Sequence, residues 1–227
     1  MLLSIIVPMY NEQSTIGDII ERTKKAAKKI GVTTEILVVD DRSYDHSLEI
    51  SKKYGIRLLT LKEHLGKGYA LRAGFLKAKG DIVVTIDSDG SHWPEELVEV
   101  LAPVLQGKAD LVIGSRYLNH KHVAARKLNA FGVRIFNGFI ELLTGVAITD
   151  SQSGYRAMTR TVLRRQILKS GGYEIESEML VKIAKNHFRV TEVPITFQQR
   201  TYGRSGVDPL VDGSKILLSI VMAYLKG

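Results

Sequence analysis

Short apolar runs alternate with amphipathic segments through the first half of the chain, and this alternation predicts its secondary structure. Runs rich in branched residues predict strands at residues 2–7, 35–39, 56–61, 82–86 and 111–114. Apolar positions at helical spacing predict helices at residues 15–30, 47–54, 67–78 and 95–106. Strands separated by helices form βαβ units, whose right-handed crossovers make neighbouring strands parallel. The pattern therefore predicts an α/β fold with a mainly parallel sheet flanked by helices in a single domain.

A polar cluster follows each of four predicted strands. The clusters read PMYNE at residues 8–12, DDRS at 40–43, DSD at 87–89 and GSRY at 114–117. In open α/β sheets, ligands bind outside the carboxyl ends of the strands. Because the carboxyl ends of parallel strands lie at one edge of the sheet, we expect these clusters to form one site.

The second half of the chain contains an unusually apolar segment at residues 126–144, which predicts a helix. One of its faces carries Leu128, Phe131, Ile135, Phe139 and Leu142, and another carries Val133, Phe136, Ile140 and Leu143. Two interpretations fit: a helix enclosed in the core, or a helix that contacts lipid or an apolar substrate, with Arg126, Lys127 and Arg134 near phosphate groups. The apolar tail at residues 216–225 is too short for a span of roughly 20 residues. It predicts a last helix, either docked on the core or lying in the membrane interface.

The composition narrows the class of protein. With 227 residues, 44% hydrophobic and 25% charged, the chain is long enough for one large α/β domain. It has no cysteine, which excludes thiolate catalysis, cysteine-bound zinc and disulfide bonds. The apolar N-terminal run lacks a basic flank and a cleavage site, so it predicts a strand rather than a signal peptide. We therefore expect a cytoplasmic protein.

The net charge of +8 indicates an anionic partner, which is a nucleic acid, a phosphorylated small molecule or an anionic membrane surface. Neither an RNP-like nor a helix-turn-helix pattern occurs in the sequence, so nucleic acid is the least favoured. The sequence also lacks a P-loop, a dinucleotide-binding glycine fingerprint and a Gly-x-Ser-x-Gly elbow. These absences disfavour hydrolases and dehydrogenases.

Asp87 and Asp89 follow a strongly hydrophobic predicted strand and are separated by one residue. Two carboxylates this close raise the pKa of one of them unless a cation lies nearby. Mg²⁺ or Mn²⁺ would supply that cation, since such ions often bind one or two protein carboxylates together with substrate phosphates. The alternative is a turn in which an aspartate caps the following helix. A second pair of acids at the same predicted edge, Asp40 and Asp41, favours the metal site.

Several ordered motifs resemble one enzyme family. Family 2 nucleotide-sugar glycosyltransferases of the GT-A fold carry stretches similar to SIIVPMYNE, EILVVDDRSYDHS, GKGYALRAGFLKAKGDIVVTIDSDGSHWPEEL and DLVIGSRY. One branch, the dolichyl-phosphate (polyprenyl-phosphate) mannose and glucose synthases, is similar in RKLNAFGVRIFNGFIELLTGVAITDSQSGYRAM, EIESEML and EVPITFQQRTYGRS. The resemblance implies a single GT-A domain with a nucleotide-sugar-binding half at residues 1–118, an acceptor-binding half at 119–206 and a C-terminal amphipathic helix at 207–227.

The resemblance also implies roles for individual residues. The nucleotide-sugar site would comprise Pro8, Tyr10, Glu12, Asp40, Asp87, Ser88, Asp89, Arg116, Arg200 and Ser205. The metal, Mg²⁺ or Mn²⁺, would be bound by Asp87, Asp89 and Ser91, and the acceptor by Arg126 and Ser153. The catalytic residues would be Asp89, Arg116, Arg126, Asp150 and Arg200, the arginines because their planar fork binds phosphate oxygens. Each arginine is alternatively a solvated surface charge. Asp150 either orients the acceptor or a sugar hydroxyl, or has a capping or turn role.

Two positions depart from the family pattern. Ser91 stands where some members have a metal-contacting glutamine, which implies more water around the metal. The late Y-G-x-S-K element reads YGRSG at residues 202–206 and lacks the usual lysine. Either Arg204 supplies that charge or the donor loop works differently.

The activity implied by the resemblance is inverting, metal-dependent transfer of a hexose from a nucleotide sugar, with GDP-mannose favoured, to dolichyl or polyprenyl phosphate. The alternatives are the same reaction with UDP-glucose or UDP-N-acetylglucosamine, and a non-catalytic nucleotide-sugar-binding subunit. A phosphate monoester has a second pKa of roughly 6, so this acceptor is an anionic nucleophile without a general base. Further expected partners are a membrane surface and either a small membrane-anchor subunit or a second copy of the chain, with no nucleic acid. The protein is expected to bind peripherally to the cytoplasmic face of a membrane.

Overall fold

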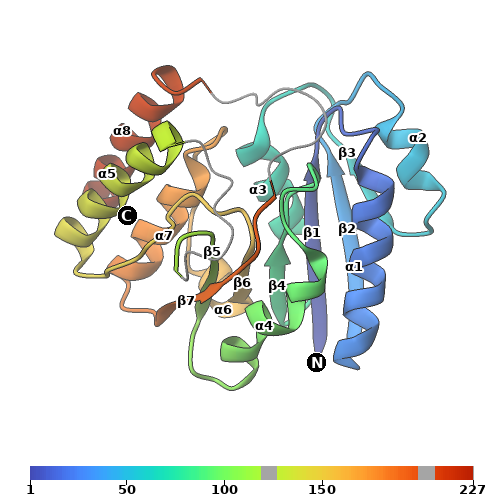
Figure 1. Ribbon diagram of the computed structural model, residues 1–227, viewed down its shortest axis with the longest axis horizontal. Coiled ribbons are helices and arrows are strands. Elements are labelled where there is room, and N and C mark those ends of the chain that lie inside the picture. Colours follow the sequence, from blue (N-terminus) through green and yellow to red (C-terminus); the bar gives the residue numbers. More distant parts are fainter. Residues whose placement is uncertain (119–126, 199–207, 227) are drawn as a thin grey trace.

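A computed structural model describes residues 1–118, 127–198 and 208–226, and for residues 127–130 it describes the backbone alone. In these residues, seven strands form one sheet in the order β3-β2-β1-β4-β6-β5-β7 (Figure 1). The strands are β1 (Leu2–Met9), β2 (Thr33–Asp40), β3 (Arg57–Thr60), β4 (Ile82–Thr85), β5 (Leu111–Ser115), β6 (Arg156–Thr159) and β7 (Val190–Pro194). The central strands β1 and β4 are buried on both faces, as their apolar, branched sequences require.

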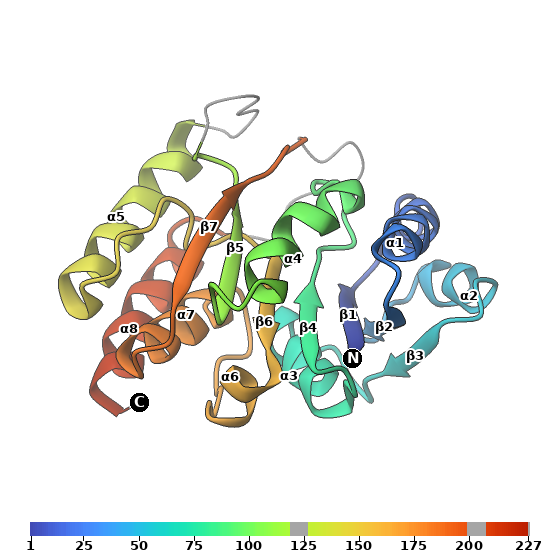
Figure 2. The same cartoon turned by 90° about the horizontal axis from the view of Figure 1, so that it is seen from below.

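Helices cover both faces of this sheet (Figure 2). One face carries α1 (Ile16–Ile30), α2 (Ser47–Lys52), the 3-10 turn η1 (Pro94–Glu96) and α4 (Leu97–Leu105). The other carries α3 (Lys67–Lys77), α6 (Arg160–Arg164), α7 (Ile175–Lys185) and α8 (Val211–Lys226), with α5 (Lys127–Thr144) packed against α7 and α8. Successive residues of a strand point to opposite faces, so Ile5 and Val7 join one core and Ile6 the other. The predicted α/β fold is confirmed.

The sheet is mainly parallel, as predicted, but it contains one reversed strand among the described residues. β6 lies between β4 and β5 and runs antiparallel to both. The hydrophobic pattern alone does not predict β6 or β7, because β6 has only four residues and begins with an arginine, and β7 is a partly exposed edge strand. Since β4 and β5 are both antiparallel to β6, they share one direction. Their carboxyl ends therefore lie at the same edge as those of β1 and β2.

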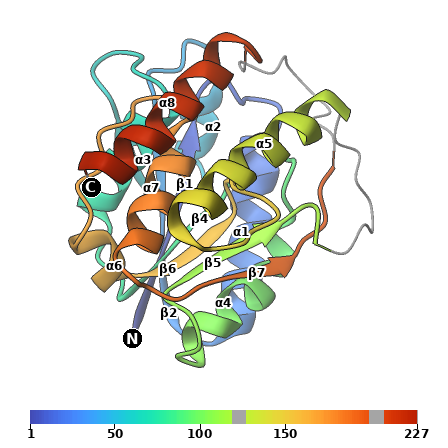
Figure 3. The ribbon, with the colours of Figure 1, turned by 90° about the vertical axis from the view of Figure 1, so that its left-hand side faces the viewer.

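The two apolar faces of α5 have different surroundings, and α8 is organised in the same way. The buried residues are Val133, Phe136 and Ile140 of α5 and Ile216, Ile220 and Ala223 of α8. The exposed residues are Phe131, Ile135, Phe139 and Leu142 of α5 and Leu218, Val221, Met222 and Leu225 of α8, which we call the α5–α8 surface. Both helices lie on the outer side of α7 (Figure 3). Within the described part of the chain, no helix is long and apolar enough to span a bilayer. The core interpretation of residues 126–144 is thus correct for one face only.

Candidate active site

The carboxyl ends of β1, β2 and β4 are tied together by hydrogen bonds. Ser88 Oγ donates to the carbonyl oxygen of Pro8 at 2.7 Å, which connects the end of β4 to the end of β1. The backbone N–H of Asp41 donates to the carbonyl oxygen of Met9 at 2.8 Å, which connects β2 to β1. The structure thus brings the polar clusters after these strands to one edge of the sheet, and Ser88 serves there as a link.

Tyr10, directly after β1, belongs to an aromatic cluster. Its ring stacks on that of His64 with centroids 3.7 Å apart, and Tyr44 approaches edge-on at 6.2 Å. His64 Nδ1 lies 2.7 Å from Oδ2 of Asp41, which is buried. The Asp41 carboxylate also accepts hydrogen bonds from two backbone N–H groups of the loop that leads to α3. Asp41 therefore fixes His64, and His64 supports the ring of Tyr10, on which a nucleobase can stack.

Two buried carboxylates accompany this cluster. Asp40 is 1% exposed, and its Oδ1 accepts a hydrogen bond from the backbone N–H of Ser43 at 3.0 Å. Its Oδ2 has no hydrogen-bond partner among the residues described. Glu12 is also buried and accepts a hydrogen bond from Thr15 Oγ1 at 3.2 Å. A buried carboxylate oxygen without a hydrogen bond destabilises the fold. Asp40 Oδ2 is therefore suited to accept a hydrogen bond from an N–H group of a bound base.

Asp87, just beyond the end of β4, is paired with a lysine that the sequence-based site does not include. Lys67 Nζ lies 2.7 Å from Asp87 Oδ1 and 2.8 Å from Glu176 Oε1. Burial alone would raise the pKa of Asp87, but the charge of Lys67 outweighs burial and lowers that pKa. Burial alone would lower the pKa of Lys67, but the carboxylates of Asp87 and Glu176 raise it. Lys67 and Asp87 are therefore both charged at neutral pH.

His92 is a buried imidazole next to Asp87. Its Nδ1 lies 3.7 Å from Asp87 Oδ2, and its ring is near those of Tyr155 and Phe197, with centroids 5.7 and 6.0 Å away. Neither ring nitrogen has a hydrogen-bond partner in the described part of the chain. Burial lowers the pKa of His92, which favours the neutral imidazole at neutral pH.

Asp89, the second strand-end carboxylate after β4, is fixed by Ser91. Its Oδ1 accepts hydrogen bonds from the backbone N–H and the hydroxyl of Ser91, at 3.0 and 2.6 Å. Asp87 has Lys67 as its counter-ion. Residues 1–118, 127–198 and 208–226 contain no group of three or more His, Cys, Asp or Glu side chains that could hold a metal. The donor set therefore fits Mg²⁺ or Mn²⁺ bound by Asp89 and completed by nucleotide phosphates and water, rather than a cage of protein ligands.

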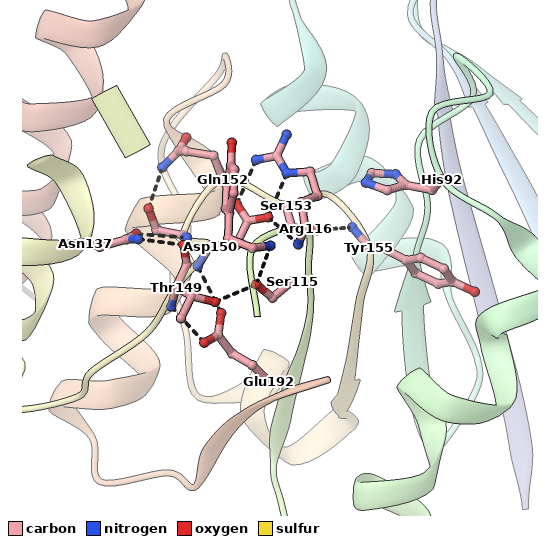
Figure 4. Close-up of polar contacts among 12 residues, drawn as sticks. His92, Ser115, Arg116, Asn137, Thr149, Asp150, Gln152, Ser153, Tyr155 and Glu192 are labelled. Carbon is pink, nitrogen blue, oxygen red and sulfur yellow. Dashed lines mark hydrogen bonds and ion pairs between the residues drawn. The ribbon is translucent and has the colours of Figure 1, made fainter. Parts of the chain in front are cut away.

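Arg116, directly after β5, forms a bidentate pair with Asp150 (Figure 4). Its Nε donates to Asp150 Oδ2 and its Nη2 to Asp150 Oδ1, both at 2.7 Å. Burial alone would lower the pKa of Arg116, but the Asp150 carboxylate raises it. The guanidinium also lies over the rings of Tyr117 and Phe197, 5.4 and 5.2 Å from their centroids. Because the pair uses Nε and Nη2, Nη1 lies outside it and is suited to a phosphate oxygen.

The loop that carries Asp150 is held from two sides (Figure 4). Glu192 of β7 accepts hydrogen bonds from the backbone N–H groups of Thr149 and Asp150, at 2.7 and 2.9 Å. Asn137 of α5 donates to the carbonyl oxygen of Thr149 at 2.8 Å. Asp150 itself is fully buried, and both of its oxygens bind Arg116. The structure thus gives Asp150 a role that the sequence does not suggest, which is to orient Arg116.

Arg156 is fully buried at the start of β6 and holds the adjoining loop. Its guanidinium donates to the carbonyl oxygens of Ser153, Glu176 and Ser151, at 2.8, 2.8 and 2.7 Å. Ser153, which the resemblance assigns to the acceptor, is fully buried in this loop. Arg156 therefore connects the Asp150 loop to α7.

We expect Arg156→Met to lower the free energy of unfolding by about 2–4 kcal/mol, because three buried carbonyl oxygens lose their donors. Urea denaturation followed by circular dichroism measures this change. Arg164→Met is the control, since Arg164 is exposed on α6. An equal loss in both variants would contradict the structural role of Arg156.

The residues that the structure brings together are not all those that the sequence predicts. Arg126, Arg200, Arg204 and Ser205 lie outside the described residues, so their roles stay predictions. The structure adds Lys67, Glu176, His64 and His92. A signal exists for two of these: Lys67 lies between two glycines at a helix start, and Glu176 interrupts an otherwise apolar helix face.

This sheet, with carboxylates after β4 and a paired arginine after β5, has the architecture of a GT-A-like α/β fold. A solved structure with a similar fold is glucosyl-3-phosphoglycerate synthase from Mycobacterium tuberculosis, in complex with Mn²⁺, uridine diphosphate and phosphoglyceric acid. The TM-score is 0.79 at 20% sequence identity, and the match covers 98% of this chain and 78% of that one.

The model of glycosyl transferase family 2 matches residues 4–170. Glycosyltransferase AglJ of Haloferax volcanii is 33% identical over 218 residues, which are 95% of this chain and 70% of that protein. A dolichol-phosphate mannosyltransferase of Pyrococcus furiosus is 33% identical over 213 residues, and the match covers 90% of this chain and 59% of that protein. The chain belongs to glycosyl transferase family 2 and is a glycosyltransferase that uses a nucleotide sugar, with relatives that act on polyprenyl phosphates.

Proposed function

We propose that this protein transfers a hexose, with GDP-mannose as the favoured donor, to a dolichyl or polyprenyl phosphate. The observation that carries the proposal is the Arg116–Asp150 pair on the same sheet edge as Asp87 and Asp89, because its guanidinium offers a phosphate-binding group separate from the carboxylates that would hold the metal. Similarity to the Pyrococcus furiosus dolichol-phosphate mannosyltransferase supports a lipid phosphate as acceptor. UDP-glucose and UDP-N-acetylglucosamine are the alternative donors, because Asp40 Oδ2 can accept a hydrogen bond from an N–H group of either guanine or uracil.

The donor would lie along the sheet edge from β2 towards β5. Tyr10 and Asp40 would bind the base at one end, and Asp89 would hold Mg²⁺ or Mn²⁺ beside the diphosphate. A bound divalent ion would stabilise the negative charge of the departing nucleoside diphosphate. The solved structure of a GT-A neighbour with Mn²⁺ and uridine diphosphate supports this choice of ion.

The acceptor phosphate would bind Arg116 at the other end of the edge. Asp150 fixes the plane of the guanidinium, so the arginine needs little reorganisation to bind a phosphate oxygen. With a second pKa of roughly 6, the lipid phosphate is ionised at neutral pH and attacks the anomeric carbon without a general base. One bond forms from the acceptor oxygen as the bond to the diphosphate oxygen breaks. A single displacement inverts the anomeric configuration.

The membrane-facing part of the protein would be the α5–α8 surface, at the cytoplasmic face of the bilayer. A prenyl chain is costly to withdraw from lipid, at roughly 0.8 kcal/mol per exposed CH₂, so the enzyme must approach its acceptor at the membrane. The exposed apolar side chains of α5 and α8 are suited to that contact. The net charge of +8 adds attraction to anionic lipids, which salt weakens.

We expect Phe139→Ser and Ile140→Ser to differ, although the residues are adjacent. Phe139 is 42% exposed, so its replacement should weaken binding to anionic vesicles and leave the fold intact. Ile140 is fully buried, so its replacement should lower the free energy of unfolding by about 3–5 kcal/mol. Vesicle co-sedimentation and urea denaturation measure the two effects. Leu76→Ser, at an exposed position on α3, is the control, and equal vesicle binding by Phe139→Ser and Leu76→Ser would exclude the α5–α8 surface.

The proposed function is tested by supplying labelled GDP-mannose, UDP-glucose and UDP-N-acetylglucosamine with three acceptors in turn: polyprenyl phosphate, polyprenol and 3-phosphoglycerate. We expect label in the lipid extract only when polyprenyl phosphate is the acceptor. Label on 3-phosphoglycerate would replace the lipid acceptor with a soluble one. Absence of transfer with every pair, while nucleotide sugars still bind, would support the non-catalytic subunit.

A further inference from the structure

Glu176 has a free carboxylate oxygen in the interior of the protein. The residue lies in the first turn of α7 and is 3% exposed. Its Oε1 is 2.8 Å from Lys67 Nζ, whereas its Oε2 has no hydrogen-bond partner among the described residues. Buried carboxylate oxygens are normally satisfied within the fold, so an exception calls for an external donor.

Close packing between the start of α3 and the loop before α7 brings Lys67 next to Glu176. Lys67 lies between Gly66 and Gly68, and both glycines pack on the backbone of the loop before α7. A Cβ at Gly66 would lie 2.7 Å from the carbonyl oxygen of Gly171, and one at Gly68 would lie 2.6 Å from its carbonyl carbon. Gly66 also has a φ of 107°, which side chains rarely allow. Only glycine at both positions lets α3 approach closely enough for Lys67 to bridge Asp87 and Glu176.

Asp87 is fixed by the same arrangement. Its Oδ1 is 2.7 Å from Lys67 Nζ, and its carboxylate packs so closely on Gly154 that a Cβ there would overlap it. Two carboxylates, one just after β4 and one in α7, are thus held on one ammonium group before any ligand binds. This rigidity is typical of a binding site whose geometry is set in advance.

The need of Glu176 Oε2 for a hydrogen-bond donor selects the class of ligand. Lys67 and the buried guanidinium of Arg156 both act on Glu176, so the cluster carries no excess of negative charge. An ionised phosphate has no proton to donate to Oε2, whereas a neutral group with hydroxyls does. In a nucleotide sugar, the neutral parts that carry hydroxyls are the ribose and the hexose, on opposite sides of the diphosphate. The base is assigned to Tyr10 and Asp40, after β1 and β2, whereas Arg156 of β6 holds Glu176 on the other side of β4, so the hexose is the part of the donor within reach.

We propose that Glu176 recognises the hexose of the donor: its Oε2 accepts a hydrogen bond from a sugar hydroxyl, while Lys67 fixes the carboxylate relative to Asp87. The proposal rests on the proposed function and assigns recognition of the sugar, as distinct from the nucleotide, to the junction of α3 and α7.

The test is isothermal titration calorimetry of the full chain with Mn²⁺, using GDP, GDP-mannose, UDP and UDP-glucose. For Glu176→Ala we expect the Kd of the nucleoside diphosphates to stay within about twofold and the Kd of the nucleotide sugar to rise at least about tenfold. Glu176→Gln keeps an acceptor oxygen and should lose less. The matched control is Glu178→Ala, on the same helix and 4% exposed, because Glu178 binds Lys182 at 2.7 Å and the backbone of residues 169 and 170. Its loss should lower Tm without changing the ratio of the two Kd values.

Monodeoxy derivatives of the hexose in the donor provide a test that does not depend on the stability of Glu176→Ala. Removal of the contacted hydroxyl should raise the Kd about tenfold for the wild type and by a smaller factor for Glu176→Gln, whose neutral amide oxygen is the weaker acceptor. A rise in Kd for GDP or UDP equal to that for the sugar nucleotides would overturn the proposal, as would unchanged sugar binding in Glu176→Ala. Failure of the wild type to bind any nucleotide sugar would instead refute the proposed function, and this inference with it.

Discussion

Asp89→Ala is expected to lower kcat/KM at least about a thousandfold, a loss of about 4 kcal/mol of transition-state stabilisation. Asp89 is a carboxylate that the family resemblance assigns to the divalent ion, and Ser91 fixes its Oδ1. EDTA should cause a loss of the same size in the wild type, and Mn²⁺ or Mg²⁺ should restore activity to the wild type but not to the variant. Initial rates of label transfer measure the loss, and far-ultraviolet circular dichroism should be unchanged.

The control for this prediction is Asp110→Ala. Asp110 precedes β5, away from the active-site edge, and forms a pair with Arg189 on the surface. Its replacement should leave kcat/KM within about twofold of the wild type. Activity that survives both Asp89→Ala and EDTA would show that the acids after β4 serve the fold and not a metal ion.

Arg116→Lys is expected to lower kcat/KM about a hundredfold, because a lysine cannot form the bidentate pair with Asp150 or present a planar fork to phosphate. Asp150→Asn should cause a loss of similar size, since the partly buried guanidinium then lacks the counter-charge of the buried carboxylate. The two residues act as one unit, so the double variant should be little worse than either single variant. Initial rates at saturating donor and varied lipid phosphate measure these losses.

The surface pair Arg189–Asp110 is a matched control for the Arg116–Asp150 pair. It has the same bidentate arrangement, with both hydrogen bonds at 3.0 Å, but the arginine side chain is 58% exposed. Arg189→Lys should leave activity within about twofold of the wild type. If instead the losses of Arg116→Lys and Asp150→Asn multiply in the double variant, the two residues act separately and the proposed orientation of Arg116 is wrong.

The position of the active-site edge could be predicted from the sequence because its signals are local. Asp40 and Asp87 each follow an apolar run, so the run and the acid that ends it are read together. The rule that parallel strands end at one edge then places both acids in one site. The antiparallel β6 does not disturb this inference, since it restores the common direction of β4 and β5.

The partners of these acids could not be predicted, because they come from distant parts of the chain. Arg116 and Asp150 meet through loops after β5 and before β6, and Lys67 and Glu176 meet only once α3 packs beside α7. A sequence pattern records the burial of a residue but not the identity of the charged group opposite it. The free oxygen of Glu176 is likewise a property of the assembled core.

For the helix at 126–144, the sequence likewise does not determine which residues are buried. Its two apolar faces are evident in the sequence, but only the position of α7 and α8 determines that Ile140 is core and Phe139 is surface. Helical periodicity gives the angle between the faces and not the side on which the neighbours lie.

We propose that the edge formed by β1, β2, β4 and β5 binds the nucleotide sugar. Crystal diffraction from the protein with Mn²⁺ and GDP or UDP, recorded near the manganese absorption edge, locates both the ion and the base. We expect an anomalous peak at about 2.0–2.3 Å from a carboxylate oxygen of Asp89, with the base against Tyr10 and Asp40. A manganese peak away from Asp89, or a base bound elsewhere than the ends of β1 and β2, would refute this assignment.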